Sequence, residues 1–307
     1  MKMKQLTVAM ITLLLTASCS EKQQDYPFRN PDLPLEERID DLLSRLTPEE
    51  KIGQMMNVTP AIERLGIPTY DWWNEALHGV ARAGRATVFP QAIAMAATFD
   101  DNAVHETFTM VSDEARAKYH QYQKDKEYDR YKGLTFWTPN INIFRDPRWG
   151  RVSEGSGEDP YLGGLIAAAM VRGYQGDDLS KDNTILSCAK HFIAYGAAQA
   201  GRDYHTVDIS ERELRDTYLP PFKAAIDAGA ATVMSAFNEY DGVPCTANSF
   251  LMRDLLRKEM GFKGFVVSDY TAVKELIAHG VAGNDEEAAS LGMNAGVNMC
   301  MVDNLYL

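Results

Sequence analysis

Segments with helical spacing alternate with short apolar runs along most of this chain of 307 residues. The helical segments are 102–123, 159–173, 210–228, 251–260 and 286–294, and the apolar runs are 134–137, 184–189, 231–237, 264–268 and 297–301. Strands that alternate with helices form a mainly parallel sheet with the helices outside it. The pattern therefore predicts an α/β fold. A (β/α)8 TIM-like barrel is the leading form at this length, and a doubly wound open sheet is the alternative.

Polar residues follow three of the apolar runs, where a parallel sheet presents its carboxyl ends. Asp269 closes the run Gly264–Ser268, Lys190 and His191 close another, and residues 235–239 close a third. These ends meet on one face of a barrel, although they lie tens of residues apart in the chain. We therefore expect a polar site there, in which an acid lies close to a lysine and a histidine.

Cations and aromatic rings could complete this site. Arg148 and Arg151 lie upstream of the lysine, and a cation next to a carboxylate favours the ionised form that a nucleophile needs. Trp72, Trp73 and Trp149 offer flat faces for the C–H surfaces of a sugar ring. Each feature also has a purely structural reading, since the rings could pack in the core, the arginines could pair with nearby acids and the acid could cap a helix. Their joint placement favours a site.

Composition argues against several classes of protein. The formal net charge of −12 disfavours nucleic acid or an anionic membrane surface as the main partner. No G-x-G-x-x-G or Walker motif follows a strand, which disfavours nucleotide binding. Downstream of position 19 the cysteines are Cys188, Cys245 and Cys300 without a C-x-x-C pair, and the 6 histidines show no metal-ligand spacing. We therefore expect no disulfide framework, no metal and no cofactor.

The N-terminus is typical of a targeting segment. A basic start is followed by an apolar stretch, Leu6–Thr16, that is too short to span a membrane as a mature helix, and then by small residues before Cys19. This predicts a signal peptide over 1–18 and resembles a bacterial lipoprotein signal with Cys19 as the lipidated residue. Residues 19–32 would form a polar tether, and the chain would reach the periplasm or the outer membrane. Ordinary cleavage without a lipid is the alternative.

Five motifs in order resemble glycoside hydrolase family 3, and the resemblance runs from about Thr47 to Met301. They are Asp146-Pro147-Arg148-Trp149-Gly150-Arg151, Gly157-Glu158-Asp159-Pro160-Tyr161, Ala189-Lys190-His191-Phe192, Met234-Ser235-Ala236-Phe237-Asn238 and the segment Gly261–Asp269. Five ordered motifs at similar spacing make a specific signal. The resemblance implies an N-terminal barrel domain of that family over 33–307, and a retaining, exo-acting β-glycosidase.

The resemblance also implies roles for individual residues. Asp269 would be the nucleophile that forms a covalent glycosyl-enzyme, and Arg151, Lys190 and His191 would bind hydroxyls of the terminal sugar. Phe237 falls where many members of the family have tyrosine, so a hydroxyl that could contact the nucleophile or the sugar is missing. Phe237 is therefore a substrate-binding candidate without a polar role.

The segment Tyr70–Gly79 resembles the β-xylosidase and α-L-arabinofuranosidase branch of the family. The resemblance implies that Glu75 binds sugar hydroxyls and that Trp73 fills the space a hexose hydroxymethyl group would need. A polar group buried without a partner costs about 1–3 kcal/mol, so a pentose should be preferred. The alternative is that Trp73 only packs the mouth of the barrel.

A retaining glycosidase needs a second carboxyl group, the acid/base, about 5–5.5 Å from its nucleophile. In the resembled family this group usually comes from a second domain on the C-terminal side of the barrel. The chain ends at Leu307, soon after Asp269, and the motifs assign neither Glu239 nor Asp241 as the acid/base. We therefore expect a fragment with an incomplete barrel end, no acid/base and little activity when isolated.

Five functions stay open at this point. The leading expectation is a β-xylosidase that acts on xylo-oligosaccharides from plant polysaccharides, with arabinofuranosidase activity and a β-glucosidase of the same family as neighbouring alternatives. A non-catalytic carbohydrate-binding lipoprotein would keep the sugar site without turnover. An unrelated barrel enzyme could instead use Lys190 to form a Schiff base.

Overall fold

The computed structural model describes residues 26–307, which belong to two compact units that divide after Thr47. The predicted signal peptide and the predicted lipid attachment site, Cys19, lie outside the described residues.

The described part of the first unit is a short helical pair. The 3-10 helix η1 (Pro27–Arg29) packs against helix α1 (Leu35–Arg45). Asp41 of α1 joins the two, because its carboxylate accepts a hydrogen bond from Phe28 N at 3.1 Å. Arg45 Nε of the same helix also donates to this carboxylate at 2.9 Å.

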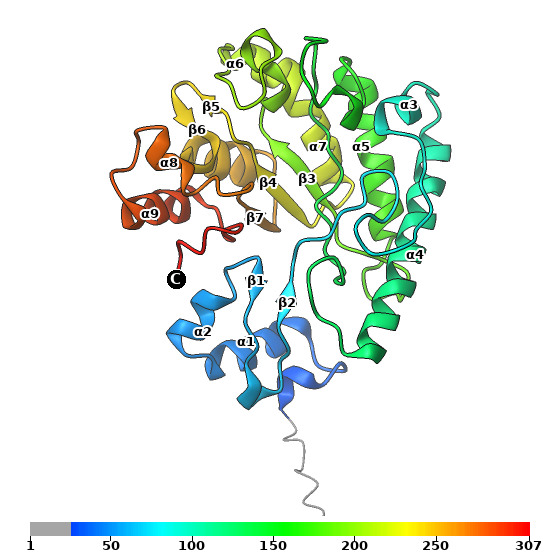
Figure 1. Cartoon of the computed structure of the whole chain (residues 1–307), viewed down its shortest axis with the longest axis vertical. Helices are drawn as coiled ribbons and strands as arrows, with labels where there is room; N and C mark the ends of the chain where they lie inside the picture. Colours follow the sequence, from blue (N-terminus) through cyan, green and yellow to red (C-terminus); the bar gives the residue numbers. More distant parts are fainter. Residues whose placement is uncertain (1–25) are drawn as a thin grey trace, which may run out of the picture. The chain divides into compact units, whose positions relative to one another are not determined.

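A parallel sheet forms the centre of the second unit, Pro48–Leu307 (Figure 1). Its strands β3 (Cys188–Phe192), β4 (Thr232–Ser235) and β7 (Phe265–Val267) pair in the order β3-β4-β7, all parallel. The strands are almost entirely buried, as expected where helices cover a parallel sheet. Figure 1 shows α7 beside β3, and α5 packs against α7.

The helices of this unit follow the predicted order along the chain. They are α2 (Pro48–Gly53), α3 (Ala92–Ala96), α4 (Asp101–Asp125), α5 (Pro160–Gln175), α6 (Glu211–Glu213), α7 (Leu219–Asp227), α8 (Glu275–Ala278) and α9 (Asp285–Ala295), with π-helices η6 (Leu214–Tyr218) and η8 (Phe250–Glu259). Two antiparallel pairs are β1 (Val58–Thr59) with β2 (Tyr70–Asp71) and β5 (Glu239–Tyr240) with β6 (Val243–Pro244). The 3-10 helices are η2 (Glu63–Leu65), η3 (Val152–Glu154), η4 (Tyr195–Ala197), η5 (Gln199–Gly201) and η7 (Cys245–Ala247).

Backbone hydrogen bonds continue the sheet beyond these strands. The bonds that join successive segments run from Phe136 N to Leu186 O, Met299 N to Val266 O, Asn57 N to Cys300 O, Trp72 N to Asn57 O and Trp137 N to Asn74 O. Together with the three paired strands, these bonds link the segments in a closed circle, as the strands of a barrel are linked. Residues 134–137 and 297–301 take part through single bridges and not as the continuous strands we predicted.

The predicted fold class is confirmed, with one departure from the ideal pattern. The strands β1 and β2 run antiparallel to each other, whereas every strand of an ideal (β/α)8 barrel is parallel to its neighbours.

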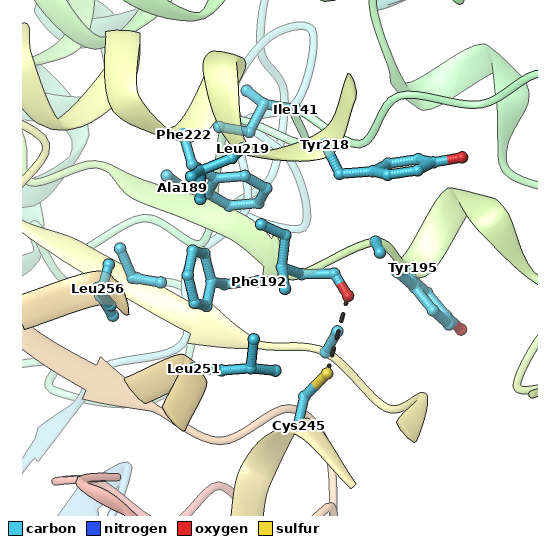
Figure 2. Packing of buried hydrophobic residues seen from close by; sticks show 14 of the residues in the cluster. Ile141, Ala189, Phe192, Tyr195, Tyr218, Leu219, Phe222, Cys245, Leu251 and Leu256 are labelled. Carbon is cyan, nitrogen blue, oxygen red and sulfur yellow. Dashed lines mark hydrogen bonds between the residues drawn. The ribbon is translucent and has the colours of Figure 1, made fainter. Parts of the chain in front are cut away.

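Phe192 anchors the largest part of the core, on the outer face of the sheet. Figure 2 shows it between Phe222 of α7 and Leu251 of η8, and all three side chains are buried. The two phenylalanine rings meet edge to face with centroids 5.1 Å apart. Truncating one such buried ring to alanine costs about 3–5 kcal/mol. This packing fixes β3, which carries two of the predicted site residues.

Helices α4 and α5 build a second cluster, in which Gly173 allows close approach. A Cβ at Gly173 would lie 2.7 Å from the Phe108 Cβ, so no larger residue fits without a shift of α4. The start of α5 is also as predicted, because Asp159 caps it by accepting a hydrogen bond from Leu162 N at 2.7 Å.

Candidate active site

Asp269 lies two residues beyond β7, at the carboxyl end of the sheet, and its side chain is 9% exposed. Its Oδ1 accepts a hydrogen bond from Tyr270 N at 2.7 Å. Its Oδ2 lies 3.4 Å from His191 Nε2 and has no hydrogen-bond partner among residues 26–307.

Burial raises the pKa of Asp269 to about 6, although the charges of Lys190 and Arg151 oppose the rise. We expected these cations to keep the carboxyl strongly ionised. They act in the expected direction, but the loss of hydration is the larger effect. The carboxyl is therefore ionised at neutral pH and becomes protonated in mildly acidic solution.

His191 lies inside β3, one residue before its end, and not after the strand as we predicted. Asn142 fixes its ring. Asn142 Oδ1 accepts a hydrogen bond from His191 N at 3.0 Å, which orients the amide so that Asn142 Nδ2 donates to His191 Nδ1 at 2.9 Å. Since Nδ1 accepts, the ring proton is on Nε2, the atom that faces Asp269. Burial, followed by the charges of Arg151 and Lys190, lowers the pKa of His191 well below its usual value, so the ring is neutral.

Arg151 precedes η3 and is held by Glu154 through two hydrogen bonds of 3.0 and 2.9 Å. Asn140 Nδ2 supports the same carboxylate at 2.9 Å. Although burial opposes it, the bond from Arg151 holds the pKa of Glu154 below its usual value. The guanidinium is therefore fixed at the edge of the site with donors left for a ligand.

A pocket of about 530 Å³ opens beside these groups. Its charged lining consists of Glu75, Glu154, Arg151, Lys190 and Arg82, and the loop 77–81 supplies most of the rest. The volume lies within the usual range for small-molecule sites. Carboxylates and cations facing one pocket provide acceptors and donors for a ligand rich in hydroxyl groups.

Trp73 connects the pocket to an aromatic cluster. Its Nε1 donates to Glu75 Oε1 at 2.7 Å, which fixes the carboxylate that lines the pocket. Its ring lies 5.2 Å from Trp137 and 6.0 Å from Tyr270, between ring centroids, and the Arg130 guanidinium lies 4.5 Å from the Trp73 ring. Trp73 is therefore locked in place close to the tyrosine that follows Asp269.

Phe237 lies two residues beyond the end of β4 and is buried, and aromatic rings surround it. Its ring centroid lies 4.1 Å from that of Tyr204 and 5.7 Å from that of Tyr195. The structure therefore places Phe237 in a stack of rings.

Three residues that we grouped with the site lie elsewhere. Arg148 is 68% exposed and bonds Asp146 through Nε at 2.9 Å and Nη2 at 2.7 Å, because the two are close neighbours in one turn. Trp149 is 1% exposed and packs in the core, so it offers no face to a ligand. Trp72 packs edge to face on Phe265 at 5.1 Å.

Sequence reasoning missed Asn140 and Asn142, which hold Glu154 and His191. The alternation in Asn140-Ile141-Asn142-Ile143 was the available signal, because alternate residues of an extended segment face the same side. Within residues 26–307, no group of three or more histidine, cysteine, aspartate or glutamate side chains is placed to hold a metal ion.

Known proteins resemble this chain over most of its length. The model of the glycosyl hydrolase family 3 N terminal domain matches residues 43–307. A xylan 1,4-beta-xylosidase of Xylanibacter ruminicola is 40% identical over 281 residues, covering 90% of this chain and 32% of that protein. A periplasmic beta-glucosidase of Salmonella typhimurium is 38% identical, over 90% of this chain and 34% of that protein. The chain therefore spans about a third of the length of these relatives.

Solved structures give the same result. An exo-beta-xylosidase bound to a xylobiose aziridine activity-based probe superposes with a TM-score of 0.79 at 32% identity, covering 89% of this chain and 36% of that chain. A beta-glucosidase of Listeria innocua in complex with isofagomine superposes with a TM-score of 0.76 at 36% identity, covering 88% of this chain and 42% of that chain.

Proposed function

This chain belongs to glycosyl hydrolase family 3, and from that premise we propose that it provides the nucleophile and the sugar pocket of an exo-acting, retaining β-glycosidase. One observation carries the proposal. The buried carboxylate of Asp269 stands at the carboxyl end of the sheet, where it faces the Nε2–H of His191 and the charges of Lys190 and Arg151 act on it.

The proposed step is a displacement at the anomeric carbon of a terminal sugar. The Asp269 carboxylate forms a bond to that carbon while the bond to the leaving oxygen breaks, which gives a glycosyl ester, and water later hydrolyses the ester. A pKa of about 6 leaves the nucleophile ionised at neutral pH. The leaving oxygen takes its proton from a separate acid, a role that we assign to none of the residues described.

We propose a terminal β-linked xylose as the preferred substrate unit, within a xylo-oligosaccharide. Trp73, locked between Trp137 and Arg130, supports this choice because it cannot easily move away from a hydroxymethyl group, and relatives named as xylosidases support it too. A β-glucosidase is the second candidate, favoured by the relatives of that name.

A fluorinated sugar with a good leaving group tests the nucleophile directly. Dinitrophenolate departs without protonation, so a dinitrophenyl 2-deoxy-2-fluoro-β-xyloside can label the nucleophile even without an acid/base. We expect intact-protein mass spectrometry to detect one sugar per chain and peptide mapping to locate it on Asp269. Asp269→Asn should abolish labelling, whereas Asp241→Asn should not. The matching glucoside should label more slowly, and no labelling by either compound would contradict the proposal.

We also propose that the chain is exported and carries a lipid on Cys19. The basic start and short apolar stretch before this cysteine support the proposal. Within residues 26–307, no helix has the length and apolar character needed to cross a membrane. The chain should therefore fractionate with membranes and incorporate labelled palmitate, and both properties should be lost in Cys19→Ala. Retention of the label in that variant would refute lipid attachment at this position.

A further inference from the structure

The loop after helix α4, residues 126–133, packs against the stretch of chain that leads into the pocket. Tyr131 N donates a hydrogen bond to Trp73 O at 3.1 Å, and Gly133 N donates to Asn74 Oδ1 at 2.8 Å. Gly133 and Asn74 are 59 positions apart in the sequence. The chain at Trp73 is therefore held by a loop that is distant from it in the sequence.

Arg130 is the side chain that this loop places over Trp73. Its guanidinium carbon lies 4.5 Å from the centroid of the Trp73 ring, and its Nε donates to Asp71 Oδ2 at 3.1 Å. The Arg130 side chain is 40% exposed, so it covers the ring from the solvent side. A guanidinium group combines stacking on an aromatic face with a directed bond to a carboxylate. Arg130 therefore links an acid to an aromatic ring.

Asp71 also holds the backbone of Trp73. It is the last residue of β2, and its side chain is only 6% exposed. While Oδ2 accepts from Arg130, Oδ1 accepts a hydrogen bond from Trp73 N at 2.9 Å. One buried carboxylate thus fixes both the main chain of Trp73 and the cation over its ring.

These contacts lead to a carboxylate inside the pocket. Trp73 Nε1 donates to Glu75 Oε1 at 2.7 Å, and Glu75 lines the pocket of about 530 Å³, whereas Arg130 and Asp71 do not. A carboxylate that is already held in one orientation loses less freedom when a ligand binds to it. The orientation of Glu75 therefore depends on residues that lie outside the pocket.

We propose that Arg130, held by Asp71, is a positioning residue that keeps Trp73 oriented so that its Nε1–H fixes the Glu75 carboxylate for a sugar hydroxyl. The inference rests on the proposed sugar pocket. A group that binds a hydroxyl equally in the ground state and in the transition state changes the affinity and not the rate of the chemical step. Loss of Arg130 should therefore weaken binding and leave the limiting rate of labelling unchanged.

The experiment measures both quantities in the full chain. Calorimetry gives the affinity for xylobiose, and labelling at increasing concentrations of the dinitrophenyl fluoroxyloside gives a half-saturating concentration and a limiting rate. Arg130→Met keeps a long side chain and removes the guanidinium. We expect xylobiose to bind this variant about five-fold more weakly, with a matching rise in the half-saturating concentration and an unchanged limiting rate. The control Arg215→Met removes an arginine that is 34% exposed and ion-paired, and it should change none of the three values.

A double-mutant cycle tests whether Arg130 acts through the ring. Trp73→Phe removes the Nε1–H but keeps an aromatic ring beneath Arg130. Once that donor is absent, loss of Arg130 should have little further effect, so the double variant should bind xylobiose about as weakly as Trp73→Phe alone. Losses in affinity that multiply would overturn the inference. Unchanged affinity of Arg130→Met would overturn it too, and a fall in its unfolding free energy in urea would then show that Arg130 only stabilises the fold.

The two measurements also separate this inference from the proposed nucleophile. A wild type that binds xylobiose but takes no label would overturn the role of Asp269, while calorimetry would still test Arg130. A wild type that binds no xylobiose would overturn the inference together with the proposed substrate.

Discussion

Asp269→Asn should stabilise the folded chain at high pH, because it removes a carboxyl whose ionisation opposes folding. Burial raises the pKa of Asp269 from 3.8 to about 6. A rise of about two units corresponds to about 3 kcal/mol, which the folded state loses when the buried group ionises. The amide of asparagine carries no charge at any pH and avoids this loss.

The sign follows from proton binding. Between about pH 4 and about pH 6 the folded state holds a proton on Asp269 that the unfolded state has released, so the free energy of unfolding falls as pH rises. The stabilising contribution of the protonated form is complete below about pH 4 and is lost as pH passes through about 6. The free energy of unfolding of Asp269→Asn should therefore rise relative to that of the wild type as pH increases.

Urea unfolding at two pH values measures the effect. We expect the difference in unfolding free energy, variant minus wild type, to be about 2 kcal/mol larger at about pH 8 than at about pH 4.5. Contacts that the amide gains or loses do not change with pH, so they cancel in this comparison. The exposed Asp182→Asn is the matched control and should give a flat difference. A flat difference for Asp269→Asn, or one that favours the wild type at higher pH, would refute the reasoning.

Three further changes test the surroundings of the site. Glu154→Gln weakens the ion pair that holds Arg151. Calorimetry should therefore show that xylobiose binds this variant about ten-fold more weakly than the wild type, whereas the control Glu158→Gln should bind xylobiose as the wild type does. Asn142→Leu leaves a buried backbone N–H and a ring nitrogen without partners, which should lower the unfolding free energy by about 2 kcal/mol or more in urea; an unchanged value would contradict the hydrogen bonds described. Gly264→Ala would drive a Cβ into the carbonyl oxygen of Ala231 and should yield little soluble protein, whereas Gly150→Ala has open space and should be tolerated.

The sequence predicted the fold well where the signal was local. Apolar spacing located α4 and α9 closely, and Asp159 marked the start of α5. The predicted helix over 210–228 is instead interrupted by the π-helix η6. Prolines at 220 and 221 have no backbone N–H to donate to the carbonyls one helical turn earlier. This explains why the preceding turn takes the wider hydrogen-bond spacing of a π-helix.

The site was harder to predict, because it depends on contacts between residues that are far apart in the sequence. Trp149 and Trp73 look alike in a sequence, yet one packs in the core and the other borders the pocket. Burial and the nearby cations shift the pKa of Asp269 in opposite directions, and predicting which effect is larger requires distances that no sequence motif contains. Asn142 could be suspected from alternation alone, but its partner His191 lies 49 positions away.

The closing contact of the barrel affects when the chain can fold during synthesis. Val302 N donates to Asn57 Oδ1 across 245 positions, and Met56 shares a buried cluster with Leu276, Cys300 and other late residues. A ribosome adds about 5–20 residues per second, so the segment around Met56 waits on the order of ten to fifty seconds for its partners. Apolar side chains near the start of the barrel are exposed throughout that interval. The nascent chain is therefore a natural client for chaperones until the segment around Cys300 emerges.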